Sequence, residues 1–273
     1  MFNITLGNIQ VAYQDLGEGP PLVLAHCSSA SSKEWSFLNN TLCKKYRILA
    51  PDLLGYGKSS AWPLTSGEVP SVDDADVLEA MIEKGGCPVH LIGHSYGGAV
   101  CLELARRYAR NGRDTIRSLF LVEPVAFYLL QATRYAKEWD EISRLGQRCI
   151  AACDAGNTKK AASIFMRYWI GRLKWQLMPK QKRAEVIRTI PKVAHEFRGM
   201  FTFPHPAEAY GEIRCPVTLV YGEKSRRPAI AVIELIQQVL GQAVVTGIPG
   251  AGHMSPFTHK LTVAGLVQTH LAR

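Results

Sequence analysis

A serine stands at the junction of a short apolar run and a helical pattern. The run Val89–Ile92 predicts a buried strand, Gly-His-Ser-Tyr-Gly follows at 93–97, and Ser95–Arg107 has helical spacing. A serine on such a strand-to-helix turn needs neighbours without bulk, which the two glycines supply. It also lies at a helix N-terminus, where free N–H groups favour developing negative charge. The pattern predicts that Ser95 is a nucleophile; the alternative is a glycine-rich turn in which Ser95 only caps the helix.

Serine needs a base before it can attack, and the chain has eight histidines. His253 lies in a glycine-rich loop, 250–256, between the last short apolar run and the last helical pattern. Because the carboxyl ends of parallel strands share one edge of a sheet, this loop is expected beside Ser95. His26 is expected to orient the loop that follows it, and His94 to pack behind the turn. We therefore predict that His253 is the general base.

Acyl transfer also needs two N–H donors directed at the developing oxyanion. The amide of Tyr96, directly after the serine, is one candidate. The other is expected in the serine-rich loop 26–32, which follows the apolar run Pro21–Ala25, and Ser28 is its most suitable residue. Both donors are backbone groups, so the oxyanion hole is predicted from Tyr96 and Ser28 without any requirement on their side chains.

The elements that must position these residues alternate along most of the chain. Short apolar runs are followed by helical patterns, which predicts a mostly parallel sheet covered on both faces. The alternation stops between Phe127 and Phe203, where only helical periodicity occurs and the last pattern precedes Pro191. We predict an α/β core of residues 1–126 and 204–273, with a helical cap of residues 127–203 over the carboxyl edge of the sheet.

Four segments resemble the α/β-hydrolase superfamily, and the resemblance extends over nearly the whole chain. They are the strand and loop around His26, Asp-Leu-Leu-Gly-Tyr-Gly-Lys-Ser at 52–59, the turn at 93–97, and Gly252-His253. The resemblance implies a doubly wound, mostly parallel eight-stranded sheet with an inserted helical cap. It also implies a serine nucleophile, a histidine base and no cofactor or metal.

Two positions depart from the pattern of that family. Cys27 stands in the loop after His26 where the family usually has glycine, so its thiol is expected to narrow the acyl pocket or to shift the loop. Ser225 stands in Tyr-Gly-Glu-Lys-Ser at 221–225 where the family usually places the aspartate of its triad. A serine cannot carry the charge that steadies an imidazolium, so an intact triad needs an acid from elsewhere.

Two glutamates compete for the role of that acid. Glu123 directly follows the apolar run Ser118–Val122, and some members of the family similarly take their acid from this strand end. Glu223 lies only two positions before Ser225, but its side chain is expected to point away. We predict Glu123 as the acid, with Glu223 and a Ser–His dyad without an acid as the alternatives.

The charge of the chain is concentrated in the predicted cap. The whole sequence has 32 Lys and Arg against 23 Asp and Glu, a formal net charge of +9, and residues 127–203 hold 15 of the former against 6 of the latter. Solvated lysines on amphipathic helices explain this excess. The alternative is that the cap binds an anionic group of a small-molecule substrate or docks on an anionic surface. No recognition motif accompanies the basic residues, which are interleaved with apolar ones, so nucleic acid is not expected as a partner.

Aromatic residues of the predicted cap are candidates for a pocket over the serine. Together with Cys27, the expected substrate-binding residues are Phe127, Trp139 and Trp169.

No feature of the sequence predicts secretion or stable membrane insertion. No apolar run approaches the roughly 18 residues that span a bilayer, and the N-terminal residues lack the pattern of a signal peptide. The seven cysteines are odd in number and contain no Cys-x-x-Cys pair. We expect reduced thiols, no bound metal and a cytoplasmic location.

These features together predict a cofactor-independent serine hydrolase. Its reaction is cleavage of an ester-like acyl bond of a small, largely apolar substrate through an acyl-enzyme. The alternatives are a carbon–carbon bond hydrolase or a cofactor-free perhydrolase with the same residues, and a non-hydrolytic receptor for a small ligand. Serine at position 95 excludes the aspartyl-ester chemistry of the haloalkane dehalogenases and epoxide hydrolases of the same family.

Overall fold

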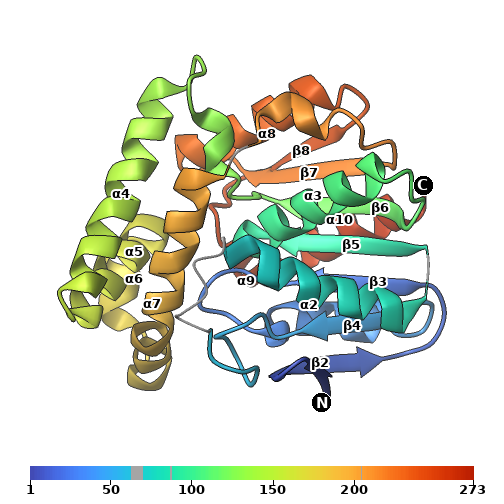
Figure 1. Cartoon of the computed structure of the whole chain (residues 1–273), viewed down its shortest axis with the longest axis horizontal. Coiled ribbons are helices and arrows are strands. Elements are labelled where there is room, and N and C mark those ends of the chain that lie inside the picture. Colours follow the sequence, from blue (N-terminus) through green and yellow to red (C-terminus); the bar gives the residue numbers. More distant parts are fainter. Residues whose placement is uncertain (63–69, 87, 204) are drawn as a thin grey trace.

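An eight-stranded sheet in the order β1-β2-β4-β3-β5-β6-β7-β8 runs through the molecule (Figure 1). The computed structural model describes residues 1–62, 70–86, 88–203 and 205–273. Strand β2 is antiparallel to both of its neighbours, and all other pairs are parallel, so the predicted mostly parallel eight-stranded sheet is confirmed. The strands are β1 (Phe2–Leu6), β2 (Ile9–Leu16), β3 (Pro21–Ala25), β4 (Arg47–Pro51), β5 (Val89–His94), β6 (Ile116–Val122), β7 (Val217–Gly222) and β8 (Val244–Ile248).

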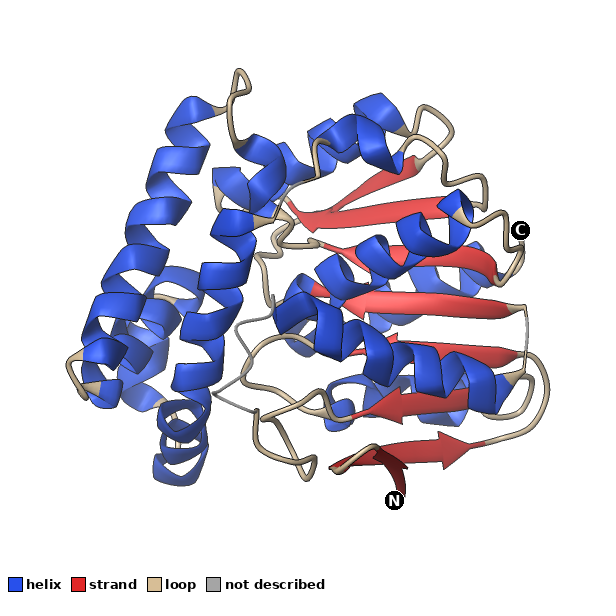
Figure 2. Cartoon of the chain, in the orientation of Figure 1, coloured by secondary structure: helices blue, strands red, loops and turns tan. Residues whose placement is uncertain are grey.

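Helices cover both faces of the sheet, which is why its central strands β3 and β5 are buried along nearly their whole length (Figure 2). Helices α2 (Pro70–Gly85), α3 (Ser95–Arg110) and α8 (Arg227–Val239) bury one face in a large core that includes the segment of helices after β6. On the other face a smaller core contains Trp35 and Val263. The elements of that face are the 3-10 helix η1 (Ser32–Leu38), α1 (Asn39–Leu42), α9 (Ser255–Thr258) and α10 (Lys260–Leu271).

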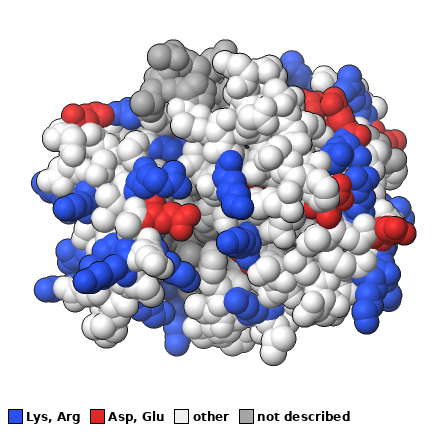
Figure 3. Space-filling model, turned by 90° about the horizontal axis from the view of Figure 1, so that it is seen from below, with Lys and Arg blue, Asp and Glu red and all other residues white. Residues whose placement is uncertain are grey.

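The segment between β6 and β7 contains helices and no strand over residues 127–203, all of which are described. We call it the helical insertion. Figure 1 shows it at the end of the sheet where the arrowheads of the parallel strands lie. In Figure 3 the charged side chains on the half of the lower face that carries it are mostly Lys and Arg. Whether it is a domain separate from the rest stays a prediction. Its elements are η2 (Phe127–Leu130), α4 (Ala136–Asp154), α5 (Thr158–Ile170), α6 (Arg172–Leu177) and α7 (Lys180–Thr202).

Helix α7 does not end before Pro191, as its sequence pattern suggested, but continues to Thr202. Proline lacks the N–H for the bond to the carbonyl four residues earlier and strains the helix there. The residues after it are nonetheless buried, among them Val193 and Phe197, each with 1% of its surface exposed. Burial of this second half against the core offsets the local cost of the proline.

The described part of the chain contains no helix that is both long and apolar enough to cross a bilayer. Six cysteines are free thiols, and Cys87 lies outside the described residues.

Candidate active site

The turn between β5 and α3 places Ser95 at the carboxyl edge of the sheet. Ser95 has a φ of +54°, a backbone conformation that residues other than glycine rarely adopt. A Cβ added at Gly97 would lie 2.4 Å from the carbonyl oxygen of His26, and one at Gly93 would lie 2.7 Å from the Cα of Gly98. Only glycine therefore fits on either side of the serine, which explains the pattern in the sequence.

Three side chains from separate parts of the chain form one hydrogen-bonded series. The Nε2 atom of His253 lies 2.9 Å from Ser95 Oγ, and its Nδ1 atom lies 2.7 Å from Glu123 Oε2. His253 comes from the loop after β8 and Glu123 from the end of β6. All three are buried, with exposed fractions of 5% for Ser95 and His253 and 0% for Glu123. The structure thus brings together the predicted nucleophile, base and acid in the order that a catalytic triad requires.

Glu123 is held by donors from the strand and loop next to it. Its Oε1 atom accepts a hydrogen bond from the amide of Gly222 at 2.8 Å and another from the hydroxyl of Ser225. Burial raises the pKa of Glu123, but the bonds from His253, Gly222 and Ser225 outweigh this effect and hold it below its usual range. Glu123 is therefore ionised near neutral pH. The competing Glu223 is exposed to solvent.

The electrostatic environment of His253 suits a base. Burial lowers its pKa below the usual value, although the carboxylate of Glu123 acts in the opposite direction. The imidazole is therefore neutral near pH 7 and can accept a proton through Nε2. Trp169 stacks on the ring, with 3.9 Å between the ring centroids and 27° between the planes, and so fixes its orientation.

A second buried pair, which the sequence did not indicate, lies behind the triad. Glu34 of η1 contacts Nδ1 of His94 through Oε1 and accepts the amide of Cys27 through Oε2 at 2.8 Å. The Nε2 atom of His94 lies 2.9 Å from the carbonyl oxygen of His253. Burial lowers the pKa of His94, but Glu34 outweighs this and raises it, which favours the imidazolium form that can donate to both partners. His94 thus packs behind the turn as expected, and Glu34 ties it to the loop 26–32.

Cys27, Glu34 and His94 are also the one group of potential metal ligands within the described residues. Both oxygens of Glu34 and both nitrogens of His94 already have hydrogen-bond partners. Burial raises the pKa of the Cys27 thiol well above its usual value, which disfavours the thiolate that a metal would need. The group is satisfied without an ion.

The two amides expected to form the oxyanion hole belong to α3 and to the loop 26–32. Tyr96 is the second residue of α3, and an amide at this position precedes the ladder of bonds within the helix. The amide of Cys27 is occupied by Glu34, whereas that of Ser28 has no protein acceptor among the described residues. The amide of Ser28 is therefore free to bind an oxyanion.

A cavity of about 490 Å³ opens over Ser95 and His253. Cys27 and Trp169 line it, as expected for substrate-binding residues. The lining combines apolar side chains of α5 with charged side chains of α6 and α7: Phe165, Met166, Trp169 and Ile170, then Lys174, Lys182 and Glu185.

Two of the expected substrate-binding residues lie outside this lining. Phe127 is buried behind Trp169, with parallel rings whose centroids are 6.4 Å apart. Trp139 packs edge-on against Phe201 at 5.5 Å. An aromatic residue on an amphipathic helix can face the cavity or the packing between helices, and the sequence pattern is the same in both cases.

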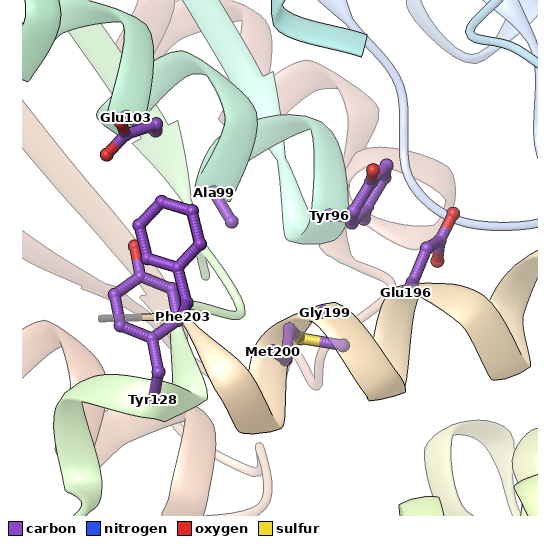
Figure 4. A pocket seen from close by; sticks show the side chains of 8 residues that line it. All are labelled: Tyr96, Ala99, Glu103, Tyr128, Glu196, Gly199, Met200 and Phe203. Atoms are coloured by element: carbon purple, nitrogen blue, oxygen red, sulfur yellow. The ribbon is translucent and has the colours of Figure 1, made fainter. Parts of the chain in front are cut away.

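A much smaller cavity of about 20 Å³ lies on the far side of Tyr96, between α3 and α7. Figure 4 shows Tyr96 reaching it from α3 and Glu196 from α7. Its volume is enough for about one water molecule. Glu196 is fully buried, although no motif in the sequence distinguished it.

Comparison with known proteins agrees with this architecture. A model of the "Alpha/beta hydrolase family" matches residues 22–265. A soluble epoxide hydrolase of Corynebacterium sp. (strain C12) is 32% identical over 120 residues, which are 44% of this chain and 40% of that protein. A pimeloyl-[acyl-carrier protein] methyl ester esterase of Nitrosospira multiformis is 34% identical over 103 residues, 37% of this chain and 39% of that protein. The matched part is thus less than half the length of either relative.

Longer matches have lower identity. Lipase 1 of Psychrobacter immobilis is 23% identical over 243 residues, covering 86% of this chain and 72% of that protein. Among solved structures, a thermophilic esterase from Thermogutta terrifontis superposes with a TM-score of 0.73 at 23% identity, over 97% of this chain and 93% of that one. The hydrolase MGS-M2 from a Medee basin deep-sea metagenome library reaches a TM-score of 0.81 at 18% identity, over 100% and 98%. At these identities the structures establish the shared fold.

Proposed function

The chain belongs to the alpha/beta hydrolase family, and from this we propose that it is a serine hydrolase that cleaves an ester-like acyl bond. The observation that supports the proposal most is the series Glu123–His253–Ser95, which is hydrogen-bonded throughout and opens onto a cavity of about 490 Å³. A neutral buried imidazole between a carboxylate and a serine hydroxyl is the arrangement that activates serine.

The reaction proceeds through an acyl-enzyme in this proposal. Ser95 Oγ attacks the acyl carbonyl while His253 Nε2 takes its proton, and Glu123 stabilises the imidazolium that forms. The amides of Tyr96 and Ser28 donate hydrogen bonds to the oxyanion. His253 then protonates the leaving group, which departs, and activates a water molecule that hydrolyses the ester on Ser95.

The lining of the cavity supports a small, largely apolar acyl group. The side chains Phe165, Met166 and Ile170 offer it an apolar wall. Lys174 and Lys182 also line the cavity, together with Glu185, and the excess of positive charge supports an anionic group on the substrate. We also propose a cytoplasmic location, which the free state of the six described cysteines supports.

The names of the relatives agree with this proposal to different degrees. Two of them are an esterase and a lipase. The epoxide hydrolase activity named for a third does not suit this chain, because Ser95 provides no carboxylate with which an epoxide could form an ester.

The test is hydrolysis of p-nitrophenyl esters of rising acyl length by the wild-type protein and by Ser95→Ala. We expect turnover that is lost in the variant, and wild-type labelling by a fluorophosphonate that the variant also loses. Labelling without ester turnover would favour cleavage of a carbon–carbon bond or perhydrolysis. Absence of both would favour a ligand receptor and contradict the proposal.

A further inference from the structure

Three charged side chains are buried together between helix α7 of the helical insertion and helix α2. Lys192 Nζ lies 2.7 Å from Asp74 Oδ2 and 3.7 Å from Glu196 Oε1, and the side chains expose 3%, 0% and 0% of their surfaces. Lys192 and Glu196 are one turn apart in the half of α7 that follows Pro191, and Asp74 belongs to α2. The ammonium group also lies 3.9 Å from the ring centroid of Trp62. We call Lys192, Asp74 and Glu196 the buried charge cluster.

Both carboxylates of this cluster bind residues that flank the nucleophile. The hydroxyl of Tyr96 donates to Asp74 Oδ2 at 2.7 Å. The hydroxyl of Ser28 donates to Glu196 Oε2, and that of Tyr56 donates to Glu196 Oε1. Tyr96 and Ser28 are the two residues whose amides are assigned to the oxyanion hole. Their side chains are therefore fixed on two carboxylates that share one lysine.

Stability alone does not explain such a cluster. Removing three charges from water is costly, and well-packed apolar residues in their place are often as stable or more stable. An oxyanion hole, by contrast, depends on donors placed to within a fraction of an ångström, and the catalytic loss on misplacement is large. Side-chain bonds from Tyr96 and Ser28 to a rigid cluster supply that precision.

We propose that the buried charge cluster positions the oxyanion hole, an inference that rests on the proposed function. Helix α7 provides Lys192 and Glu196, so the helical insertion sets the geometry of catalysis as well as lining the cavity. Glu196 is a positioning residue in this scheme: it acts through Ser28 and touches neither the substrate nor the reacting atoms.

Because Glu196 ionises, its positioning role should be visible in the pH dependence of kcat. Burial raises the pKa of Glu196 to about 7, with Lys192 and the hydroxyl donors acting in the opposite direction. Protonation converts one acceptor oxygen into a donor, so the carboxyl group can no longer accept from Ser28 and Tyr56 in the same way. The hydrogen bond between Ser28 and Glu196 therefore weakens as the pH falls through about 7. The groups that face Glu196 from the surrounding elements are Lys192, Asp74, Tyr96, Tyr56, Ser28 and the thiol of Cys27.

The first test compares Glu196→Gln with Asp140→Asn, which makes the same change at an exposed carboxylate on α4. At pH 8 we expect kcat for a p-nitrophenyl ester to fall about tenfold in Glu196→Gln, with KM within about twofold of wild type. The wild-type kcat should show a step near pH 7 that Glu196→Gln lacks, and Asp140→Asn should match wild type. A Glu196→Gln protein with wild-type kcat, or one that keeps the step, overturns the proposal.

The second test removes the contact from the other side. Ser28→Ala keeps the amide but loses the hydroxyl that binds Glu196. We expect a lower kcat, and a double variant with Glu196→Gln that is no slower than the slower single variant, because both changes break one contact. Losses that multiply overturn the proposal. A wild-type protein without turnover dependent on Ser95 would instead contradict the proposed function, so the two failures are distinguishable.

Discussion

Ser225 donates a hydrogen bond to Glu123, although it occupies the position where the family usually places the acid itself. The loop after β7 therefore still serves the histidine, but indirectly. Glu123 reaches His253 from the end of β6, and Ser225 and the amide of Gly222 hold its second oxygen. The missing aspartate is accounted for by a carboxylate from the neighbouring strand.

Glu123→Gln should lower kcat by about 10³-fold, because an amide can neither neutralise the imidazolium of His253 nor fix its tautomer. Steady-state kinetics with a p-nitrophenyl ester measures the effect. Glu223→Gln is the matched control, since Glu223 is exposed, and should stay within about twofold of wild type. Equal rates in Glu123→Gln and wild type would remove Glu123 from the triad.

The acidic limb of kcat/KM should have its midpoint below pH 6.5. His253 acts as a base only when neutral, and its pKa is lowered, so activity rises with pH through a value below the usual 6.5. The measurement is clearest in Glu196→Gln, which lacks the other ionisation expected near pH 7. In Glu123→Gln the midpoint should move lower still, because the carboxylate raises the pKa of His253. A midpoint above 6.5 would contradict this account of the base.

Glu196→Gln should gain stability relative to wild type as the pH rises. The pKa of Glu196 is raised from 4.5 to about 7 in the folded protein, so the folded state binds the extra proton between these values. The free energy of unfolding of the wild type therefore decreases across this window relative to the variant, by about 3 kcal/mol. Denaturant unfolding at pH 4.5 and pH 8 checks this. A difference that is constant with pH would mean that the pKa of Glu196 is not raised.

Trp169→Ala should raise KM and lower kcat, because it removes both a wall of the cavity and the ring stacked on His253. We expect kcat/KM to fall by about 30-fold, consistent with a few kcal/mol for a lost aromatic contact. Trp139→Ala is the control: it removes a tryptophan of the same insertion that packs on Phe201 away from the cavity. Comparable losses in kcat/KM in two folded variants would contradict the placement of these residues.

The sheet and the arrangement of Ser95, His253 and Glu123 could be predicted because their signals are local. Short apolar runs indicate parallel strands covered on both faces, and the glycines beside Ser95 are required by contacts closer than 3 Å. Since such strands end at one edge, the loops with His253 and Glu123 could be placed beside the serine without a structure.

The buried charge cluster could not be predicted, because nothing in its spacing differs from a solvated helix face. Lys192 and Glu196 are four apart, as in many exposed ion pairs, and they follow a proline that suggested the end of a helix. Glu34 likewise stands in a short 3-10 helix without a motif. Only the docking of α7 against α2, and of η1 against β3 and β4, shows that these charges are buried. The same limit applies to Phe127 and Trp139.

In the proposed reaction, Ser95 carries the acyl group during turnover. Rapid acid quench of the protein with a p-nitrophenyl ester, followed by mass spectrometry of its peptides, tests this claim directly. We expect the mass of the acyl group on the peptide that contains Ser95, and its absence in Ser95→Ala. Full turnover by Ser95→Ala, or an acyl group on another residue, would contradict it.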